Sequence, residues 1–192
     1  LSPYIGFSTP DIHRLGGNLW HKTKRKIRED IIKTAKELLK IYAQRQLTQR
    51  PNYLTNENML NEIDQGFEFI ETPDQKKTIE EIIGDMEKNT PMDRLVCGDV
   101  GFGKTEIAIR AAARAAISGR QTALIAPTTV LAWQHFQTFK SRFLKFPINI
   151  SLLSRLQSPS EQKEIIRKLK SGEIDIIIAT HRLFSKDIEF SA

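Results

Sequence analysis

The chain has 192 residues, of which 40% are hydrophobic and 27% are charged, and its formal net charge is +6. This composition can supply a core for one domain or slightly more, and the sequence has no run of eighteen apolar residues that could cross a membrane. The N-terminus lacks the pattern of a secretory signal, and a single cysteine, Cys97, excludes an internal disulfide. We therefore expect a cytoplasmic protein without a membrane partner, and a start at Leu1 instead of methionine indicates a piece of a longer chain.

The N-terminal quarter of the chain carries most of the positive charge. Residues 1–17 contain several Pro and Gly and are predicted to be loop, or the end of a β-rich module. Residues 18–50 hold ten basic and three acidic side chains, a surplus of +7 that leaves −1 for the remainder. Their apolar residues recur at helical spacing, which predicts a long amphipathic helix beginning at Asn18. This basic helix could bind nucleic acid or an acidic protein, although a solvated helix face is the commoner meaning of such a charge run.

A linker and then an alternation of helices and strands follow. Residues 51–71 show no clear period apart from a turn of helix near 57–63, and Thr72 with Pro73 marks the start of the next helix. Strands are predicted at 94–97, 122–126, 148–153 and 175–179, with helices at 104–117, 130–143 and 161–169. This order predicts an α/β fold with a mostly parallel sheet covered by helices on both faces. Cys97 is expected to be buried in the first strand.

One motif between the first strand and its helix points directly to chemistry. Residues 98–105 fit the pattern Gly-x-x-x-x-Gly-Lys-Thr, in which glycines let backbone N–H groups surround a phosphate. Lys104 is expected to reach the β- and γ-phosphates of ATP, and the Thr105 hydroxyl to coordinate Mg²⁺. The full set of phosphate-binding candidates is Gly98, Asp99, Val100, Gly101, Phe102, Gly103, Lys104 and Thr105.

Polar residues also follow the later strands. Ligands bind at the carboxyl ends of parallel strands, and hydroxyls or N–H groups at helix starts can hold nucleic-acid phosphates without reading sequence. Each of these side chains could alternatively serve only as a helix cap. Taken together on one edge, they predict a surface for a nucleic-acid backbone, made by Pro127, Thr128, Thr129, Ser154, Arg155, Thr180 and His181. His135 and His181 lack the spacing of metal ligands.

Three stretches resemble the first motor lobe of superfamily-two helicases. They are Thr72-Pro73-Asp74-Gln75, residues 92–106 around the phosphate motif, and residues 126–132. Within that superfamily they are most similar to the transcription-repair-coupling translocases, as are His13-Arg14-Leu15-Gly16-Gly17 and residues 41–45. The resemblance covers the whole chain. It implies that residues 1–17 end an RNA-polymerase-binding module, 18–50 form a connecting helix, 51–71 a linker, and 72–192 part of a RecA-like lobe.

The resemblance also assigns roles to individual residues. Gln75 resembles the glutamine that reads adenine, with Phe67 or Phe69 packing on the base. Thr128, Thr129 and Gln134 resemble a DNA-contacting motif, and Ser154-Arg155 with Thr180-His181 resemble later ones. The implied parent is an ATP-dependent translocase on double-stranded DNA that displaces stalled RNA polymerase and recruits excision-repair proteins.

One departure and two alternatives accompany this interpretation. The family carries an Asp-Glu motif one strand further on, but after Ala179 this sequence has only the acids Asp187 and Glu189. We therefore expect weak nucleotide binding without useful hydrolysis, and self-association through uncovered sheet edges. A RecG-like fork-remodelling helicase is the second interpretation, although such proteins usually have Ser at Phe102 and Glu at Thr129. A non-catalytic module that binds DNA or protein is the third.

Overall fold

The computed structural model describes residues 18–53 and 57–191, so the predicted end of a β-rich module at 1–17 lies outside the described residues. The chain divides into two compact units, 1–49 and 50–192, and each is described by itself. In the part of the chain that is described, no helix is both long enough and apolar enough to span a membrane.

The first unit contains the long helix α1 (Asn18–Leu47), which has 30 residues and confirms the predicted amphipathic helix. Its apolar stripe is solvent-exposed, with Ile31 62% and Leu39 67% exposed. An ion pair one turn apart, between Arg25 and Glu29 at 3.8 Å, adds little stability at such an exposed position.

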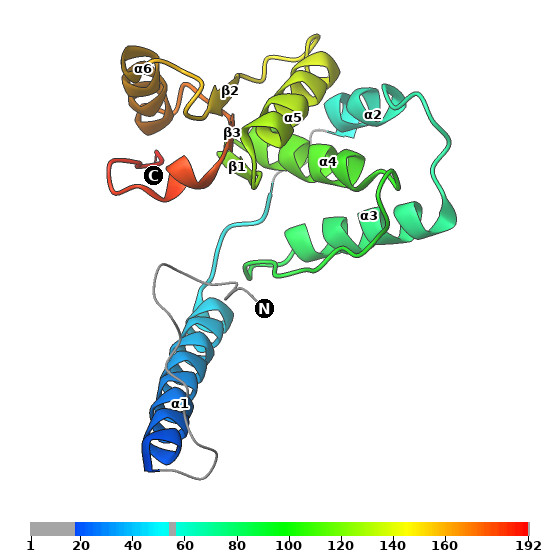
Figure 1. Ribbon diagram of the computed structural model, residues 1–192. Helices are drawn as coiled ribbons and strands as arrows, with labels where there is room; N and C mark the ends of the chain where they lie inside the picture. The colour runs from blue at the N-terminus through cyan, green and yellow to red at the C-terminus, as the bar shows by residue number, and fades with distance from the viewer. Residues whose placement is uncertain (1–17, 54–56, 192) are drawn as a thin grey trace. The chain divides into compact units, whose positions relative to one another are not determined.

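The second unit holds the sheet and its covering helices (Figure 1). Along the chain its elements are α2 (Glu57–Gln65), α3 (Pro73–Met86), α4 (Lys104–Ile117), β1 (Thr122–Ile125), α5 (Thr129–Arg142), β2 (Ile150–Leu153), α6 (Pro159–Lys170), β3 (Ile176–Ala179) and the 3₁₀ turn η1 (His181–Phe184). These bounds confirm the predicted alternation after residue 100, with small shifts at the element ends.

The sheet is parallel, in the order β1-β3-β2, and β3 at its centre is buried along its whole length. Successive side chains of a strand point to opposite faces. Accordingly Ile176 and Ile178 pack with residues of α4 and α5, whereas Ile177 and Ala179 pack with the apolar face of α6. The predicted α/β fold, with helices on both faces of a parallel sheet, is confirmed.

Local side-chain caps set the start of two helices. The Thr72 hydroxyl accepts a hydrogen bond from the Gln75 backbone N–H at 3.2 Å, and the Thr72 N–H donates to the Gln75 side chain at 2.8 Å. This reciprocal capping box, with Pro73 at the first helical position, confirms the predicted start of α3. The same device at Ser158 and Glu161 starts α6 two residues before its predicted first residue.

The strand predicted at 94–97 is wrong. No strand is assigned to this segment; Leu95 is 86% exposed and Cys97, expected to be buried, is also exposed. A strand is stabilised by hydrogen bonds to a neighbouring strand, and the ladders of this sheet join only β1, β3 and β2. The apolar run Leu95-Val96-Cys97 predicts burial, but it does not specify which neighbour will provide the pairing.

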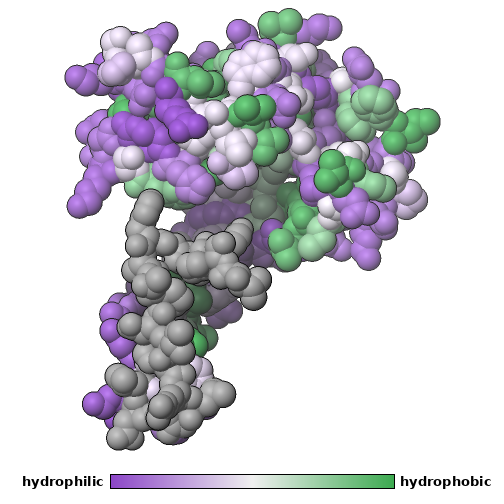
Figure 2. Space-filling view, in the orientation of Figure 1, coloured by the Kyte–Doolittle hydropathy of each residue, from purple (hydrophilic) through white to green (hydrophobic). Residues whose placement is uncertain are grey.

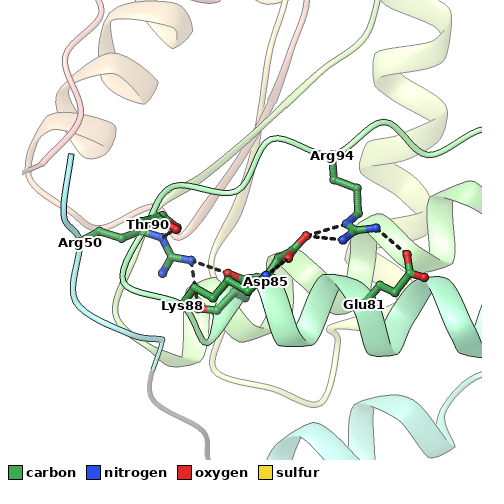
Figure 3. A network of polar contacts seen from close by, with 7 residues as sticks. Arg50, Glu81, Asp85, Lys88, Thr90 and Arg94 are labelled. Carbon is green, nitrogen blue, oxygen red and sulfur yellow. Dashed lines mark hydrogen bonds and ion pairs between the residues drawn. The ribbon is translucent and has the colours of Figure 1, made fainter. Parts of the chain in front are cut away.

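Ion pairs hold this segment to α3 instead (Figure 3). Arg94 donates to the Asp85 carboxylate at 2.7 Å and pairs with Glu81 at 2.5 Å, and Lys88 donates to Asp85 at 2.7 Å. From the other side, Arg50 donates to the carbonyl oxygens at the C-terminal end of α3 and to that of Thr90. Two arginines from different segments therefore hold the C-terminal half of α3.

Candidate nucleotide and nucleic-acid site

The Gly-rich motif forms a loop that opens α4. Gly101 and Gly103 have φ values of +87° and +72°, in the left-handed region that favours glycine. Gly103 is the N-cap of α4 and provides no side-chain cap, so the first N–H groups of this helix are not satisfied by a capping side chain. Uncapped N–H groups at a helix N-terminus favour an anion.

Lys104 closes the inside of this loop. Its ammonium donates to the carbonyl oxygens of Gly98 and Asp99, both at 2.6 Å. The side chain is exposed at the mouth of the loop, where a phosphate could take the place of these carbonyl contacts. The predicted phosphate residues 98–105 thus lie in one continuous turn around the Lys104 ammonium.

Gln75 lies directly against the loop. Its amide nitrogen donates to the Phe102 carbonyl at 3.0 Å, while its amide oxygen remains in the α3 capping box. A Cβ at Gly103 would collide with the same amide nitrogen, so glycine permits this close approach. A hollow of about 190 Å³ lies between α3 and the loop, lined in part by Gln75, Gly98 and Lys104.

Phe69 belongs to a second hollow that also borders the loop. This hollow, of about 550 Å³, is lined by Gly103 and Thr105 from the loop, by Phe67 and Phe69, and by side chains from α5. The Phe69 ring is 73% exposed and meets the Phe67 ring edge to face, with centroids 5.5 Å apart. Hydrophobic residues are visible on the side of the molecule that carries the α2–α3 connection and the start of α4 (Figure 2).

Most of the predicted nucleic-acid residues meet in one hollow at the carboxyl ends of β1 and β3. It measures about 440 Å³, and we call it the strand-end surface. The Thr128 hydroxyl accepts a hydrogen bond from the Leu131 N–H at 3.2 Å. Thr128 is therefore also the cap of α5, which was the alternative role for these side chains. Thr180 precedes η1 without such a cap. The predicted residues on this surface are Pro127, Thr128, Thr129, Arg155, Thr180 and His181.

Two predicted residues lie elsewhere. Ser154 is fully buried, and its hydroxyl and backbone N–H both donate to the Gln157 side chain, at 2.9 and 2.8 Å. The predicted contact of Ser154 with nucleic acid is wrong, because its side chain stabilises the turn after β2 and does not reach the surface. Gln134 is exposed on α5 and does not line the strand-end surface.

Sequence reasoning missed two residues that line this surface, Arg182 and Gln162. Arg182 donates to both carboxylate oxygens of Asp187, at 2.8 and 2.6 Å, and to Gln162 at 3.2 Å. These hydrogen bonds hold the pKa of Asp187 below its usual range. The position of Arg182, directly after the strand-end pair 180–181, was a usable signal, whereas nothing in the sequence placed Gln162 there.

Comparison with known proteins agrees with this geometry. The profile of the DEAD/DEAH box helicase family matches residues 72–191. The transcription-repair-coupling factor of Bacillus subtilis is 47% identical over 97% of this chain, and that of Staphylococcus aureus is 46% identical over 95%. In both cases the chain spans only 16% of the length of the relative.

Solved structures show the same fold. The structure of RecG bound to a three-way DNA junction matches 79% of this chain and 21% of that protein, with a TM-score of 0.73 and 36% identity. A hypothetical ATP-dependent RNA helicase from Sulfolobus tokodaii matches 68% of this chain and 37% of its own, with a TM-score of 0.50 at 20% identity. The phosphate-type loop, the sheet with its strand-end surface and the family match together establish that the chain belongs to the DEAD/DEAH box helicase family.

Proposed function

We propose that this chain provides the ATP-binding part of a translocase that moves on double-stranded DNA and couples transcription to repair. The observation that carries the proposal is the loop 98–105, which brings two left-handed glycines, an uncapped helix start and the Lys104 ammonium together. The 46–47% identity to transcription-repair-coupling factors supports the specific biological role.

The residues present fit Mg²⁺–ATP. The Lys104 ammonium and the N–H groups at the start of α4 would hold the phosphates, and the Thr105 hydroxyl would bind the metal. The Gln75 amide, already fixed at the loop, would recognise adenine, and the exposed Phe69 ring would pack on the base. Bound ATP would supply free energy through transfer of its terminal phosphoryl group. The role of these residues is to hold the phosphates in position.

The strand-end surface would contact the DNA backbone. Its threonine hydroxyls and the exposed guanidinium of Arg155 are suited to phosphates and carry no base-specific pattern. Such binding weakens steeply with salt, because each phosphate contact releases condensed counterions. DNA binding that is independent of sequence suits a motor that must move along any duplex.

The finer parts of the proposal concern the whole protein. RNA polymerase and excision-repair proteins would be its partners, as the name of the relatives implies. Phosphoryl transfer needs metal, a positioned water and charge stabilisation together, and we propose that these 192 residues alone bind nucleotide weakly without useful turnover. The outer edges of β1 and β2, which pair with no other described strand, would favour self-association.

A RecG-like fork remodeller is the second candidate, favoured by the TM-score of 0.73 to the RecG structure. This chain is 36% identical to RecG and 47% identical to the Bacillus subtilis transcription-repair-coupling factor. The RecG-like function is therefore the second candidate. A pull-down with the RNA polymerase β-subunit, beside binding to forked and linear DNA, separates the two. For that comparison the parent protein is required, because the relatives are about six times longer than this chain.

Nucleotide binding is the first test. Calorimetric titration of the chain with Mg²⁺–ATP should show binding that Lys104→Ala weakens more than about tenfold, the loss of one charge-assisted phosphate contact. Lys145→Ala, which removes an exposed lysine outside the loop, is the matched control and should bind normally. Equal affinity for all three proteins would refute the assignment of the loop.

Hydrolysis is the second test. Steady-state ATPase assays with and without duplex DNA should give no useful turnover for these residues alone. Robust DNA-stimulated turnover that disappears in Lys104→Ala would contradict that expectation, while leaving the nucleotide site itself intact.

A further inference from the structure

A cluster of charged side chains begins at Glu106, immediately after residues 98–105, which we call the phosphate loop after its proposed ligand. Glu106 follows Thr105 in α4, and its side chain is only 8% exposed. One of its carboxylate oxygens accepts hydrogen bonds from Arg110 at 3.1 Å and from Arg142 of α5 at 2.7 Å. A carboxylate this well buried is costly unless cations pair with it, so the two guanidiniums are held in defined positions.

Arg110 extends the cluster to the segment that leads into α3. Its guanidinium forms an ion pair with Glu71, the residue before the Thr72 cap, and another with Asp64 of α2 at 3.3 Å. Its side chain is 9% exposed. One arginine therefore links the first turn of α4, the end of α2 and the start of the capping box that holds Gln75.

Both guanidiniums also face the same aromatic ring. The Cζ atoms of Arg110 and Arg142 lie 5.8 and 6.0 Å from the centroid of the Phe67 ring, within the range of cation–π attraction. A Cβ at Gly66 would come within 2.6 Å of the Arg142 guanidinium, so the backbone there passes close to it. Phe67 in turn supports the exposed Phe69 ring, which shares the larger hollow with Thr105.

We propose that Arg110, together with Arg142 and their shared partner Glu106, positions the Phe67–Phe69 wall beside the phosphate loop and so sets the affinity for the nucleobase. This inference rests on the proposed nucleotide site and deepens it. Arg110 is a positioning residue: it contacts the wall and the capping segment and lines neither of the two hollows beside the loop. Its loss should weaken recognition of the base and leave recognition of the phosphates intact.

The test compares a ligand that has a base with one that has none. Affinities for Mg²⁺–ATP and for Mg²⁺–tripolyphosphate are measured by calorimetry on the whole chain, below the unfolding temperature of each variant. Arg110→Gln and Glu106→Gln should lower the affinity for ATP by about tenfold, as expected for the loss of one base–aromatic stacking contact. Affinity for tripolyphosphate should change by less than about twofold.

Three further variants sharpen the comparison. Arg110→Lys keeps the charge but loses the planar fork, and should recover only part of the ATP affinity. Arg167→Gln breaks an exposed ion pair with Glu164 on α6 and should leave both affinities unchanged. If Arg110→Gln does not fold, Phe67→Leu removes the ring without unpairing a buried charge and should lower ATP affinity alone.

The outcomes are distinct. Equal loss of affinity for both ligands in Arg110→Gln or Phe67→Leu, or no loss for ATP, overturns the inference and leaves the phosphate site standing. Wild-type protein that binds tripolyphosphate as tightly as ATP overturns it too, because the base then contributes nothing. Wild-type protein that binds neither ligand refutes the proposed function and the inference together.

Discussion

The strand-end surface and the phosphate loop are built on supports of different kinds. The strand-end surface follows β1 and β3, which are joined by a parallel ladder, and β3 is buried along its length. The phosphate loop follows a segment that lies outside the sheet and is held to α3 by the ion pairs of Arg94. The first surface therefore depends on the buried sheet. The second depends on ion pairs, on the packing of Val96 against the apolar cluster of α3 and α4, and on glycine backbone geometry.

The largest expected effect is on stability. It distinguishes the buried strand β3 beneath the strand-end surface from the exposed segment before the phosphate loop. Ile177 in β3 is fully buried, and Ile177→Ala should lower the free energy of unfolding by about 3 kcal/mol through lost burial and the cavity left behind. Leu95 is exposed, and Leu95→Ala should change it by less than about 0.5 kcal/mol. Urea denaturation measures both. Similar losses would show that Leu95 is buried, contrary to its exposure here.

Gly103 tests the backbone of the loop. Gly103→Ala would place a Cβ at a φ of +72° and against the Gln75 amide, and should destabilise the fold by about 1–2 kcal/mol while weakening ATP binding. Gly84 in α3 has nothing within 4 Å of an added Cβ, and Gly84→Ala should stabilise by about 0.5 kcal/mol. Thermal unfolding with and without Mg²⁺–ATP measures both; a neutral Gly103→Ala would refute the close packing of Gln75.

The ion pairs of α3 predict a pH dependence. Hydrogen bonds from Lys88 and Arg94 hold the pKa of Asp85 below its ordinary value of 3.8. The carboxylate therefore stabilises the folded chain above that value, and its contribution is lost as the pH falls through the lowered pKa. Asp85→Asn should cost about 1 kcal/mol at neutral pH and progressively less toward about pH 3. A constant difference between the two proteins across this range in urea denaturation would contradict the assignment.

The smallest effect concerns the strand-end surface. Arg155 is exposed there, and Arg155→Gln should weaken binding to duplex DNA severalfold for every sequence tested. The slope of log affinity against log salt should become shallower by about 1, the value for one lost phosphate contact. Arg120→Gln removes an exposed arginine that precedes β1, at the opposite end of this strand from the surface, and is the control for total charge. Fluorescence anisotropy across a salt series measures the slope, and an unchanged slope would exclude Arg155 from the interface.

Much of this architecture could be predicted from local sequence. The Thr72–Gln75 capping box, the glycines of the phosphate motif and the apolar runs of β1, β2 and β3 each act over a few residues. The sequence therefore indicated where helices and strands lie and which hydroxyls follow the strands. The burial of Ser154 could not be predicted in this way, because its position after β2 looks the same as that of an exposed cap.

The sequence by itself determined the elements, the phosphate motif and the family, since these depend on residue type and short spacing. Only the tertiary structure decided which runs pair, because the partner of a strand can come from anywhere in the chain. That is why Leu95–Cys97 stayed outside the sheet while Ile176–Ala179 became its centre. Tertiary structure also brought Asp64 and Glu71 to Arg110, and Arg142 to Glu106, since these charges far apart in sequence become one cluster only when α2, α4 and α5 pack together. Glu106 and Arg110 lie one turn apart on α4, so their pairing is local.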